Sequence, residues 1–514
     1  MLAKIESCSI LGMEAFLVEV EVDISNGLPA FNIVGLPDAA IQESRERVRS
    51  GISNSEFEFP LKRITVNLAP ADLRKEGPSF DLPVAVGILA ATKQISRDML
   101  SDYLFVGELS LTGEIRPVNG VLPMALRAKE SKKKGFIVPK ENASEAALIG
   151  GLKIIPASSL SEIVKFFSGE KEIEPITEDI KRLFMNNTVS DNINFCDIKG
   201  QEHAKRAIEV AAAGGHNLLM VGPPGSGKTM LARRMPSILP DMTFEEAIET
   251  TKIYSIAGML PSKVALVTSR SFRAPHHTIS TAGLVGGGQH PRPGEISLSH
   301  NGVLFLDEFP EFTKSALEVL RQPLEDGIVT ISRASSTSTF PARFMLVAAM
   351  NPCRCGYLGD KIKECVCVPS SIRQYKSKIS GPLLDRIDIQ VEVPRLTKKE
   401  LVGVSSGESS ETIKERVQRA RDRQQKNIGD SNLSCNAQMS PRLLKKYCKL
   451  SDSAQNFLEN AIDKLGLSGR AYDKVLRISK TIADLGERDL IEVEHLAEAI
   501  QYRCSNNSNN YYNF

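Results

Sequence analysis

A glycine-rich segment of this chain has the residue types and spacing of a phosphate-binding loop. It consists of Gly222, Pro223, Pro224, Gly225, Ser226, Gly227, Lys228 and Thr229, which fits G-x-x-x-x-G-K-[ST]. The glycines let backbone amides converge on phosphate oxygens, Lys228 would neutralise the β- and γ-phosphates, and the Thr229 hydroxyl would ligate Mg²⁺. The alternative is a chance glycine-rich turn. It is disfavoured because a short apolar strand is expected at Leu218–Val221 and a helix at Thr229–Met235. The sequence therefore predicts a site for ATP and Mg²⁺.

Two further apolar runs end in polar residues that could complete such a site. Val303–Leu306 is followed by Asp307, which suits a Mg²⁺ carboxylate, and by Glu308, which can polarise the attacking water. Two solvated acids at a strand end are the alternative. Phe344–Met350 ends at Asn351, which could sense the γ-phosphate, although Asn-Pro is also a common start of a turn. The presence of Glu308 favours hydrolysis over binding alone.

Four of the nine cysteines form one cluster, Cys353, Cys355, Cys365 and Cys367. Four thiolates within such a short segment can surround one Zn²⁺ tetrahedrally, although C-x-C is tighter than the usual spacing of zinc ligands. Free structural cysteines or a redox pair are the alternatives. A zinc ion held there would be structural, because no open ligand position is evident.

The composition is that of an ordinary globular protein, with 42% apolar and 25% charged residues in 514. The net charge of +2 creates no global field for nucleic acid, so such contacts would need local patches or a central pore. The longest apolar stretch, Leu82–Ala91, is too short to cross a bilayer, and the start of the chain is a poor signal peptide. We expect a cytoplasmic protein with no membrane partner.

The elements that must position these residues divide the chain into several parts. Residues 1–167 have a mixed α/β pattern, and a helix is expected over Asp38–Ser50, with Asp38 as its cap and Gly51 as its stop. Residues 168–194 form a predicted linker. Residues 195–394 alternate apolar strands with helices, which is typical of a parallel sheet flanked by helices. Strands are also expected at Ala15–Val22, Ile64–Leu68 and Gly135–Val138.

The rest of the chain is predicted to be helical. Residues 395–507 contain two long helical patterns, Ser410–Lys426 and Ala471–Leu485. Residues 508–514 belong to an Asn- and Ser-rich tail that we expect to be disordered.

Several long motifs resemble those of a known family. The loop GPPGSGKT is followed by FRAPHHTISTAGLVGGGQHPRPGEISLSHNGVLFLDE, then by NPCRCG and SGPLLDRID. Together they resemble the magnesium-chelatase-like AAA+ proteins of the YifB/ComM family, and the resemblance spans nearly the whole chain. It implies an AAA+ P-loop NTPase core with a parallel sheet, a C-terminal helical lid, and a homo-hexameric ring with ATP at subunit interfaces. For the ComM branch it implies ATP-dependent branch migration of branched or single-stranded DNA during homologous recombination in natural transformation.

The resemblance also assigns roles to single residues. Arg386 matches the arginine finger, which would reach the γ-phosphate held by a neighbouring subunit, although a surface ion pair with Asp385 or Asp388 is the alternative. Arg470 matches the second sensor arginine of the lid, with Arg477 as the other candidate. The NPCxCG pattern belongs to the resembled family and supports the structural zinc site.

Two loops could contact DNA. Arg273, His276 and His277 precede a glycine-rich stretch that continues to His290 and Arg292, and this pair of segments could bind backbone phosphates in a pore. Bracing of a subunit interface is an equally good interpretation. A hairpin expected over 327–344, with Arg333, is the other candidate.

The N-terminal part resembles the Lon protease domain, a fold of the ribosomal S5 domain 2 type. Ser79 lies where the Lon nucleophile would lie, but the position of the activating lysine is occupied by Leu122, and Lys129 is too far along to match. Peptidase activity is therefore not expected. The main hypothesis is a DNA motor, and the alternative is a magnesium-chelatase-type ATPase that remodels a protein partner.

Overall fold

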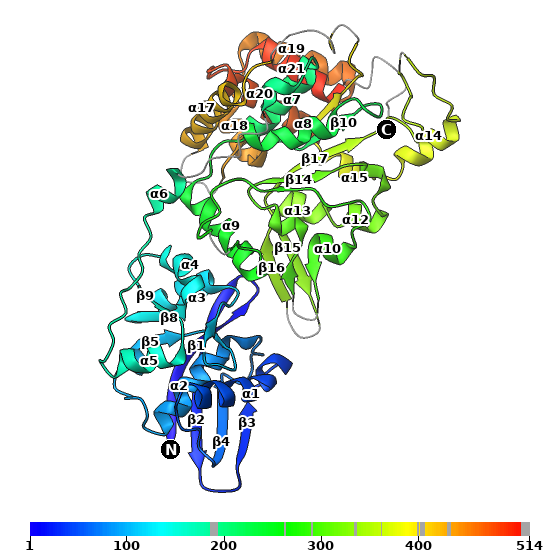
Figure 1. The fold of residues 1–514 in the computed structure, drawn as a ribbon. Helices are drawn as coiled ribbons and strands as arrows, with labels where there is room; N and C mark the ends of the chain where they lie inside the picture. Colours follow the sequence, from blue (N-terminus) through cyan, green and yellow to red (C-terminus); the bar gives the residue numbers. More distant parts are fainter. Residues whose placement is uncertain are drawn as a thin grey trace.

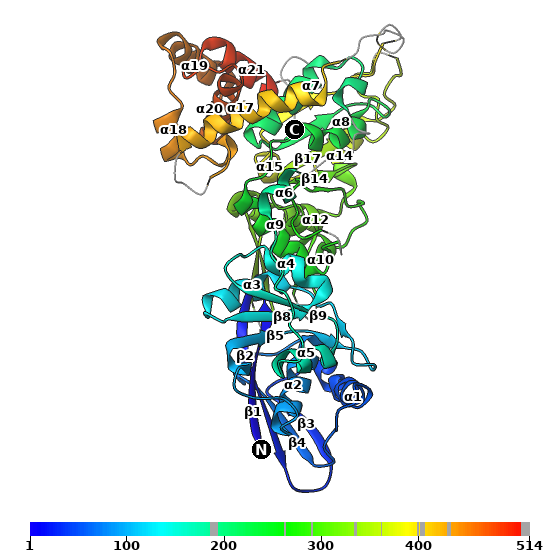
Figure 2. The same ribbon diagram turned by 60° about the vertical axis from the view of Figure 1, so that its left-hand side comes forward.

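A computed structural model describes residues 1–185, 194–261, 264–288, 291–333, 337–360, 362–397, 400, 407–428 and 433–504. It places two large β-sheets, together with three two-stranded ones, along an elongated molecule (Figure 1). The N-terminal sheet lies at one end, the second sheet lies in the middle, and the C-terminal helices lie beside the second sheet at the other end (Figure 2).

The N-terminal part is built on a seven-stranded mixed sheet in the order β3-β4-β2-β1-β5-β8-β9. In its long antiparallel pair β1–β2, most of β2 alternates buried and partly exposed side chains, whereas β1 is buried at three consecutive residues, Ser7, Cys8 and Ser9. Helix α2 is buried along its whole length, which explains its uniformly apolar sequence. The strands are β1 Leu2–Leu11, β2 Glu14–Ser25, β3 Ala30–Val34, β4 Arg63–Ala69, β5 Tyr103–Phe105, β6 Glu108–Leu109, β7 Ile115–Arg116, β8 Gly135–Pro139 and β9 Lys153–Ala157; the helices are α1 Ala39–Asn54, α2 Asp81–Ala91, α3 Val121–Glu130, α4 Ala143–Ala147, α5 Leu160–Phe167 and α6 Ile180–Met185.

The prediction for the first helix is confirmed at its start and wrong at its end. The Asp38 side chain accepts a hydrogen bond from the Ile41 amide and caps α1, but the helix runs through Gly51 to Asn54. Gly51 is buried, and a Cβ atom there would lie 3.2 Å from the Ser110 carbonyl oxygen. The glycine therefore serves close packing against a neighbouring loop and not helix termination.

The second sheet has five strands in the order β11-β14-β17-β10-β18, and every neighbouring pair is parallel. The predicted parallel sheet is therefore confirmed, and all of its strands end at the same edge. Its three central strands, β14, β17 and β10, are buried on both faces, which explains their continuous apolar runs. The strands are β10 Leu218–Val221, β11 Phe272–Arg273, β14 Val303–Leu306, β17 Met345–Met350 and β18 Ile389–Glu392; the two-stranded pairs are β12 Gly286–Gly287 with β13 Arg292–Pro293 and β15 Ile328–Ser332 with β16 Thr337–Pro341.

Helices pack on both faces of this sheet and continue into the C-terminal helical domain. One face shares a single hydrophobic core with α7, α17, α20 and α21, so that the lid and the sheet are packed together. The other face packs against α12 and the β15–β16 hairpin. The helices are α7 Glu202–Gly214, α8 Lys228–Arg234, α9 Phe244–Ala257, α10 Thr281–Val285, α11 Glu295–Leu298, α12 Lys314–Glu318, α13 Arg321–Asp326, α14 Pro369–Lys376, α15 Gly381–Leu384, α17 Ser410–Ile428, α18 Pro441–Tyr447, α19 Asp452–Leu465, α20 Gly469–Leu485 and α21 Val493–Cys504.

The N-terminal part is attached to the core through α3 and α9. Leu122, the residue at the Lon lysine position, is fully buried in a cluster with Met242, Ala247 and Leu266. The buried Glu145 carboxylate accepts hydrogen bonds from the Leu122 amide, at 2.8 Å, and from the Ser255 hydroxyl. The position that would carry a catalytic lysine in Lon therefore forms a contact between the two parts.

Part of the predicted linker is packed. Leu183 and Phe184 of α6 lie against the same apolar cluster. Residues 186–193 and the predicted tail, 508–514, lie outside the described residues. Among the described helices, none combines the length and apolar composition that a membrane span needs.

Candidate functional site: a nucleotide-binding edge of the parallel sheet

The phosphate-binding loop connects β10 to α8 at the carboxyl edge of the sheet. Its amide at Gly222 donates to the Met350 carbonyl at 3.2 Å, which ties the loop to the end of β17. A Cβ atom on Gly222 would lie 2.1 Å from the Val393 carbonyl oxygen, so only glycine fits there. Gly225 and Gly227 have φ angles of +74° and +91°, which glycine alone adopts without strain. The glycine pattern thus follows from the backbone path of the loop.

Lys228 is buried and its ammonium group faces neutral oxygens. Its Nζ donates to the carbonyls of Gly222 and Pro223, at 2.7 and 3.0 Å, and to Asn351 Oδ1, at 3.3 Å. Burial lowers the pKa of Lys228 to about 8, although the Asp307 carboxylate opposes the shift. Among the described residues, no carboxylate forms an ion pair with this ammonium. A buried cation without a paired anion fits the phosphates of a nucleotide.

The predicted magnesium ligands also meet. The Thr229 hydroxyl donates to Asp307 Oδ2 at 2.7 Å, and Asp307 Oδ1 accepts the Glu308 amide at 2.9 Å. Hydroxyl and carboxylate oxygens are the ligands that Mg²⁺ prefers, so this pair fits the ion. Lys228, Thr229, Asp307 and Asn351, which were singled out from three separate segments, thus lie at one edge of the sheet.

Glu308 has a partner that the sequence analysis did not find. Its Oε2 lies 3.1 Å from Nδ1 of His277, and Glu308 itself is half exposed, with a φ angle of +52°. The His277 ring packs edge-on against Phe312 and lies 4.1 Å, between ring centroids, from His276. His277 follows β11, which pairs with β14 in parallel, so the order of strands brings it to the carboxylate. The sequence analysis predicted no strand at Phe272–Arg273, and this short strand, β11, is what brings His277 to Glu308.

Arg386 and Arg470 line the same cavity, which is not the phosphate-binding loop. Both line a cavity of about 640 Å³ between the core and the lid, and none of its lining residues comes from the segment 222–229. The Arg386 guanidinium pairs with Glu325 and donates to the Pro382 carbonyl at 2.7 Å. Arg470 is 71% exposed and lies 4.0 Å from Asp385. Arg477, the other candidate, also lines this cavity, where it donates to the Met439 carbonyl at 3.0 Å.

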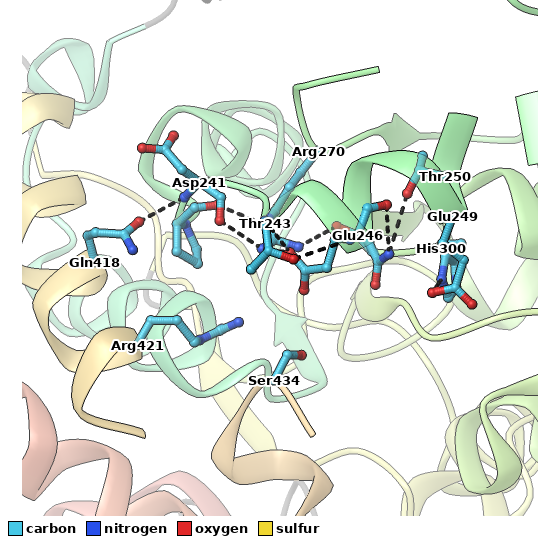
Figure 3. A network of polar contacts seen from close by, with 12 residues as sticks. Asp241, Thr243, Glu246, Glu249, Thr250, Arg270, His300, Gln418, Arg421 and Ser434 are labelled. Atoms are coloured by element: carbon cyan, nitrogen blue, oxygen red, sulfur yellow. Dashed lines mark hydrogen bonds and ion pairs between the residues drawn. The ribbon is translucent and has the colours of Figure 1, made fainter. Parts of the chain in front are cut away.

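A polar network joins the core to the lid beside this cavity (Figure 3). Arg270 pairs with Glu246 at 2.7 Å and donates to backbone carbonyls, while the Asp241 amide donates to Gln418 of α17 at 2.8 Å. Arg421, also on α17, is buried and donates to the carbonyls of residues 212 and 213 at the end of α7. This arrangement satisfies carbonyls at the helix C-terminus and fixes the position of the lid.

Comparisons with known proteins agree with this geometry. The family "Magnesium chelatase, subunit ChlI" matches residues 194–401, "Subunit ChlI of Mg-chelatase" matches 20–142, and "Magnesium chelatase, subunit ChlI C-terminal" matches 407–503. The chain is 47% identical over 507 residues to competence protein ComM of Haemophilus influenzae, covering 98% of this chain and 97% of that protein. It is 44% identical over 509 residues to the uncharacterized protein YifB of Escherichia coli, with the same coverage of 98% and 97%.

The chain belongs to the YifB/ComM family of magnesium-chelatase-like AAA+ proteins. A shorter match, 28% identity over 162 residues and 29% of each chain, relates it to Lon protease 2 of Bacillus subtilis and supports the Lon-like character of the N-terminal part. Family and site together indicate an ATPase of the YifB/ComM type.

The cysteine cluster of this family member has the geometry of a metal site. The four Sγ atoms all lie within 4.8 Å of one another, and three of the separations are 3.4, 3.6 and 3.6 Å. A tetrahedral zinc with bonds of about 2.3 Å needs separations of roughly 3.8 Å, so the residues fit the ion. Burial alone would raise the pKa of Cys355, but the amides of Tyr357 and Val366 and neighbouring thiols lower it to about 6, which favours a thiolate ligand.

The candidate DNA loops are placed only in part. Arg273 forms a two-pronged ion pair with Glu295 of the same chain, at 2.7 and 2.6 Å, so its guanidinium is already engaged within the chain. Arg292 is exposed, and His290, the other residue predicted there, lies outside the described residues. The β15–β16 hairpin forms as predicted, with Arg333 at its exposed end.

Proposed function

We propose that this protein is an ATP-driven motor that acts on DNA, as a hexameric branch-migration helicase in homologous recombination and natural transformation. In the nucleotide site, the loop amides and Lys228 bind the phosphates, while Thr229 and Asp307 hold Mg²⁺. The bound ion would neutralise charge on the β- and γ-phosphates. Glu308 would accept a proton from the attacking water, and Asn351, which accepts a hydrogen bond from Lys228, would contact the γ-phosphate.

The separation of the two groups of residues carries the oligomeric part of the proposal. The phosphate loop and the acids lie at the edge of the sheet, whereas Arg386 and Arg470 line the core–lid cavity, which contains no residue of the loop. Phosphoryl transfer gains most from a guanidinium on the developing charge, and within one described chain neither arginine is at the loop. A ring in which Arg386 faces the nucleotide of the next subunit brings the two groups together.

DNA as substrate is supported by the relatives and by the candidate loops. The relative with 47% identity over nearly the full chain is a competence protein, and competence concerns the uptake of DNA. Two arginines, Arg292 in β13 and Arg333 directly after β15, are exposed and available to contact backbone phosphates. Contacts of this kind bind phosphates without reading sequence, as a motor on DNA requires.

A second candidate function has its own support. All three matched families are named for a magnesium-chelatase subunit. The alternative is therefore an ATPase that remodels a protein partner, with the same nucleotide chemistry and no dependence on DNA.

The first experiment is steady-state ATP hydrolysis by the wild type and Glu308→Gln, with and without branched or single-stranded DNA. Glu311→Gln is the matched control, because Glu311 is an exposed acid nearby that pairs with Lys378. Glu308→Gln should reduce kcat by about 10²- to 10⁴-fold and retain nucleotide binding. Stimulation of the wild type by DNA, together with ATP-dependent exchange of strands in a four-way junction, supports the motor; hydrolysis that is indifferent to every DNA excludes it and favours the protein-remodelling alternative.

A further inference from the structure

The cysteine loop lies directly on the phosphate-binding loop. Gly356, which follows Cys355, is buried with a φ angle of +87°. A Cβ atom there would lie 2.6 Å from Pro224 Cδ and 2.7 Å from its Cγ, and 3.8 Å from the Asn351 side chain. The backbone of the cysteine loop therefore touches both the phosphate loop and the residue that contacts Lys228.

Three further contacts join this loop to residues around the nucleotide site. Its first residue, Asn351, accepts the Lys228 ammonium at 3.3 Å. Within the loop, Asp360 pairs with Arg395 at 3.2 Å, and the Arg395 guanidinium lies 5.3 Å from the Tyr357 ring centroid. Arg395 comes from the segment just after β18, two residues beyond the carbonyl of Val393 that closes over Gly222. The two segments that enclose the phosphate loop are thus joined to each other.

The described part of this loop lacks regular secondary structure, although Cys353, Gly356 and Leu358 are buried. Between β17 and α14, the described residues contain no helix or strand, and the apolar side chains of Ile362, Val366 and Val368 are exposed. Cys353 is fully buried, whereas the other three cysteines are partly exposed. A segment without regular structure or a core of its own is usually held by cross-links or a metal. The cysteine cluster supplies the ligands for one.

We propose that the four cysteines bind Zn²⁺ in order to position the phosphate-binding loop, so that nucleotide affinity depends on this metal. The inference rests on the proposed ATPase function and adds a role for the metal in it. The metal fixes the turn Cys353–Gly356, and this turn lies against Pro224 and Asn351. Loss of the metal releases the turn and, with it, the Lys228 contact.

The test measures metal content and nucleotide affinity of the full-length protein separately. Zinc is measured by mass spectrometry, and the dissociation constant is measured with a fluorescent ATP analogue in Mg²⁺. The double variant Cys365→Ser/Cys367→Ser should lose zinc and bind nucleotide about tenfold or more weakly, since displacement of a binding loop by about 1 Å is costly. Cys196→Ser, a half-buried cysteine outside the cluster, is the matched control and should change neither quantity.

A second variant disturbs the contact without touching the ligands. Gly356→Ala should retain zinc but weaken nucleotide binding, because the new Cβ meets the Pro224 ring. Gly466→Ala is its control, since Gly466 has a comparable φ angle of +61° and a Cβ atom added there would meet nothing within 4 Å. The effect of Gly356→Ala should shrink in a Pro224→Ala background, where the ring is absent.

The outcomes separate the inference from the proposed function. A wild type that holds no zinc, or a zinc-free double variant whose affinity stays within about twofold of the wild type, overturns the inference while the ATPase stands. A wild type that binds no nucleotide overturns the proposed function itself. Zinc loss together with weaker binding, and weaker binding with zinc retained in Gly356→Ala, supports the inference.

Discussion

Lys474 is the residue whose loss should reveal how the lid holds Arg386, the proposed arginine finger. It lies on α20, and its Nζ is 3.1 Å from Asp388 Oδ1 and 3.0 Å from the Ile387 carbonyl oxygen. It also donates to the carbonyl of Asp385. These contacts lie on both sides of Arg386 in the sequence, so the Lys474 ammonium on the lid fixes the backbone that carries Arg386.

The expected loss of stability follows from the burial of the Lys474–Asp388 ion pair. The Lys474 and Asp388 side chains are only 10% and 11% exposed. Burial would raise the pKa of Asp388, but Lys474, His216 and the Asn217 amide together hold it well below its usual range. In Lys474→Met the volume is kept and the carboxylate loses its cation, which should cost about 3–5 kcal/mol of stability at pH 7.

The stability that the Asp388 carboxylate contributes should decrease in acid. Because the folded-state pKa of Asp388 is depressed, its contribution is present above the unfolded value of about 4 and is lost as pH falls through the folded pKa. In Lys474→Met the unpaired carboxyl can be protonated, so the gap between variant and wild type should narrow in acid. The assay is urea unfolding of the full chain at several pH values, with Lys464→Met as an exposed-lysine control.

Two results would refute this reasoning. The first is a loss of less than about 1 kcal/mol in Lys474→Met, the size expected for an exposed ion pair. The second is failure of Asp388→Asn to recover stability in the Lys474→Met background, since the double variant contains no unpaired buried charge. Hydrolysis by Lys474→Met should fall along with stability because Arg386 is no longer held.

Three further predictions concern other contacts. His277→Ala should lower kcat about tenfold with unchanged nucleotide affinity, since Glu308 loses its charge-assisted partner; an equal change in affinity would contradict this. Burial raises the pKa of Glu145, so the free-energy cost of burying its charged carboxylate is absent at low pH and grows as pH rises through the folded pKa. Glu145→Gln should therefore preserve stability at pH 5 and raise it at pH 8 in thermal unfolding. A loss of stability at both pH values would contradict this. Arg386→Ala should abolish hydrolysis alone yet regain activity when mixed with Lys228→Ala, because each subunit type supplies what the other lacks; no recovery on mixing argues against a shared site.

The local pattern of the sequence predicted most of the nucleotide site. Lys228, Thr229, Asp307 and Asn351 each follow a short apolar strand, and parallel strands bring such positions to one edge. The assignment of Gly51 as a helix stop failed because glycine also serves close packing, which depends on a neighbour distant in sequence.

Other features depended on contacts between distant segments. Gly356, which follows Cys355, packs against Pro224, more than a hundred positions earlier in the chain. His277 lies next to Glu308 because β11 and β14 pair in the folded sheet. No periodicity or motif records such a pairing, since it results from how elements pack and not from local preference.

The sequence by itself determined the phosphate loop, the acidic strand end, the parallel sheet and the grouping of four cysteines, because these depend on the spacing of residues and on the succession of apolar strands and helices along the chain. Only the tertiary structure decided that Arg386 and Arg470 share a cavity away from the phosphate loop, and that Leu122 joins the N-terminal part to α9. The physical reason is that side-chain partners are chosen by the packing of whole elements, whose free energy is spread over many residues far apart in the chain.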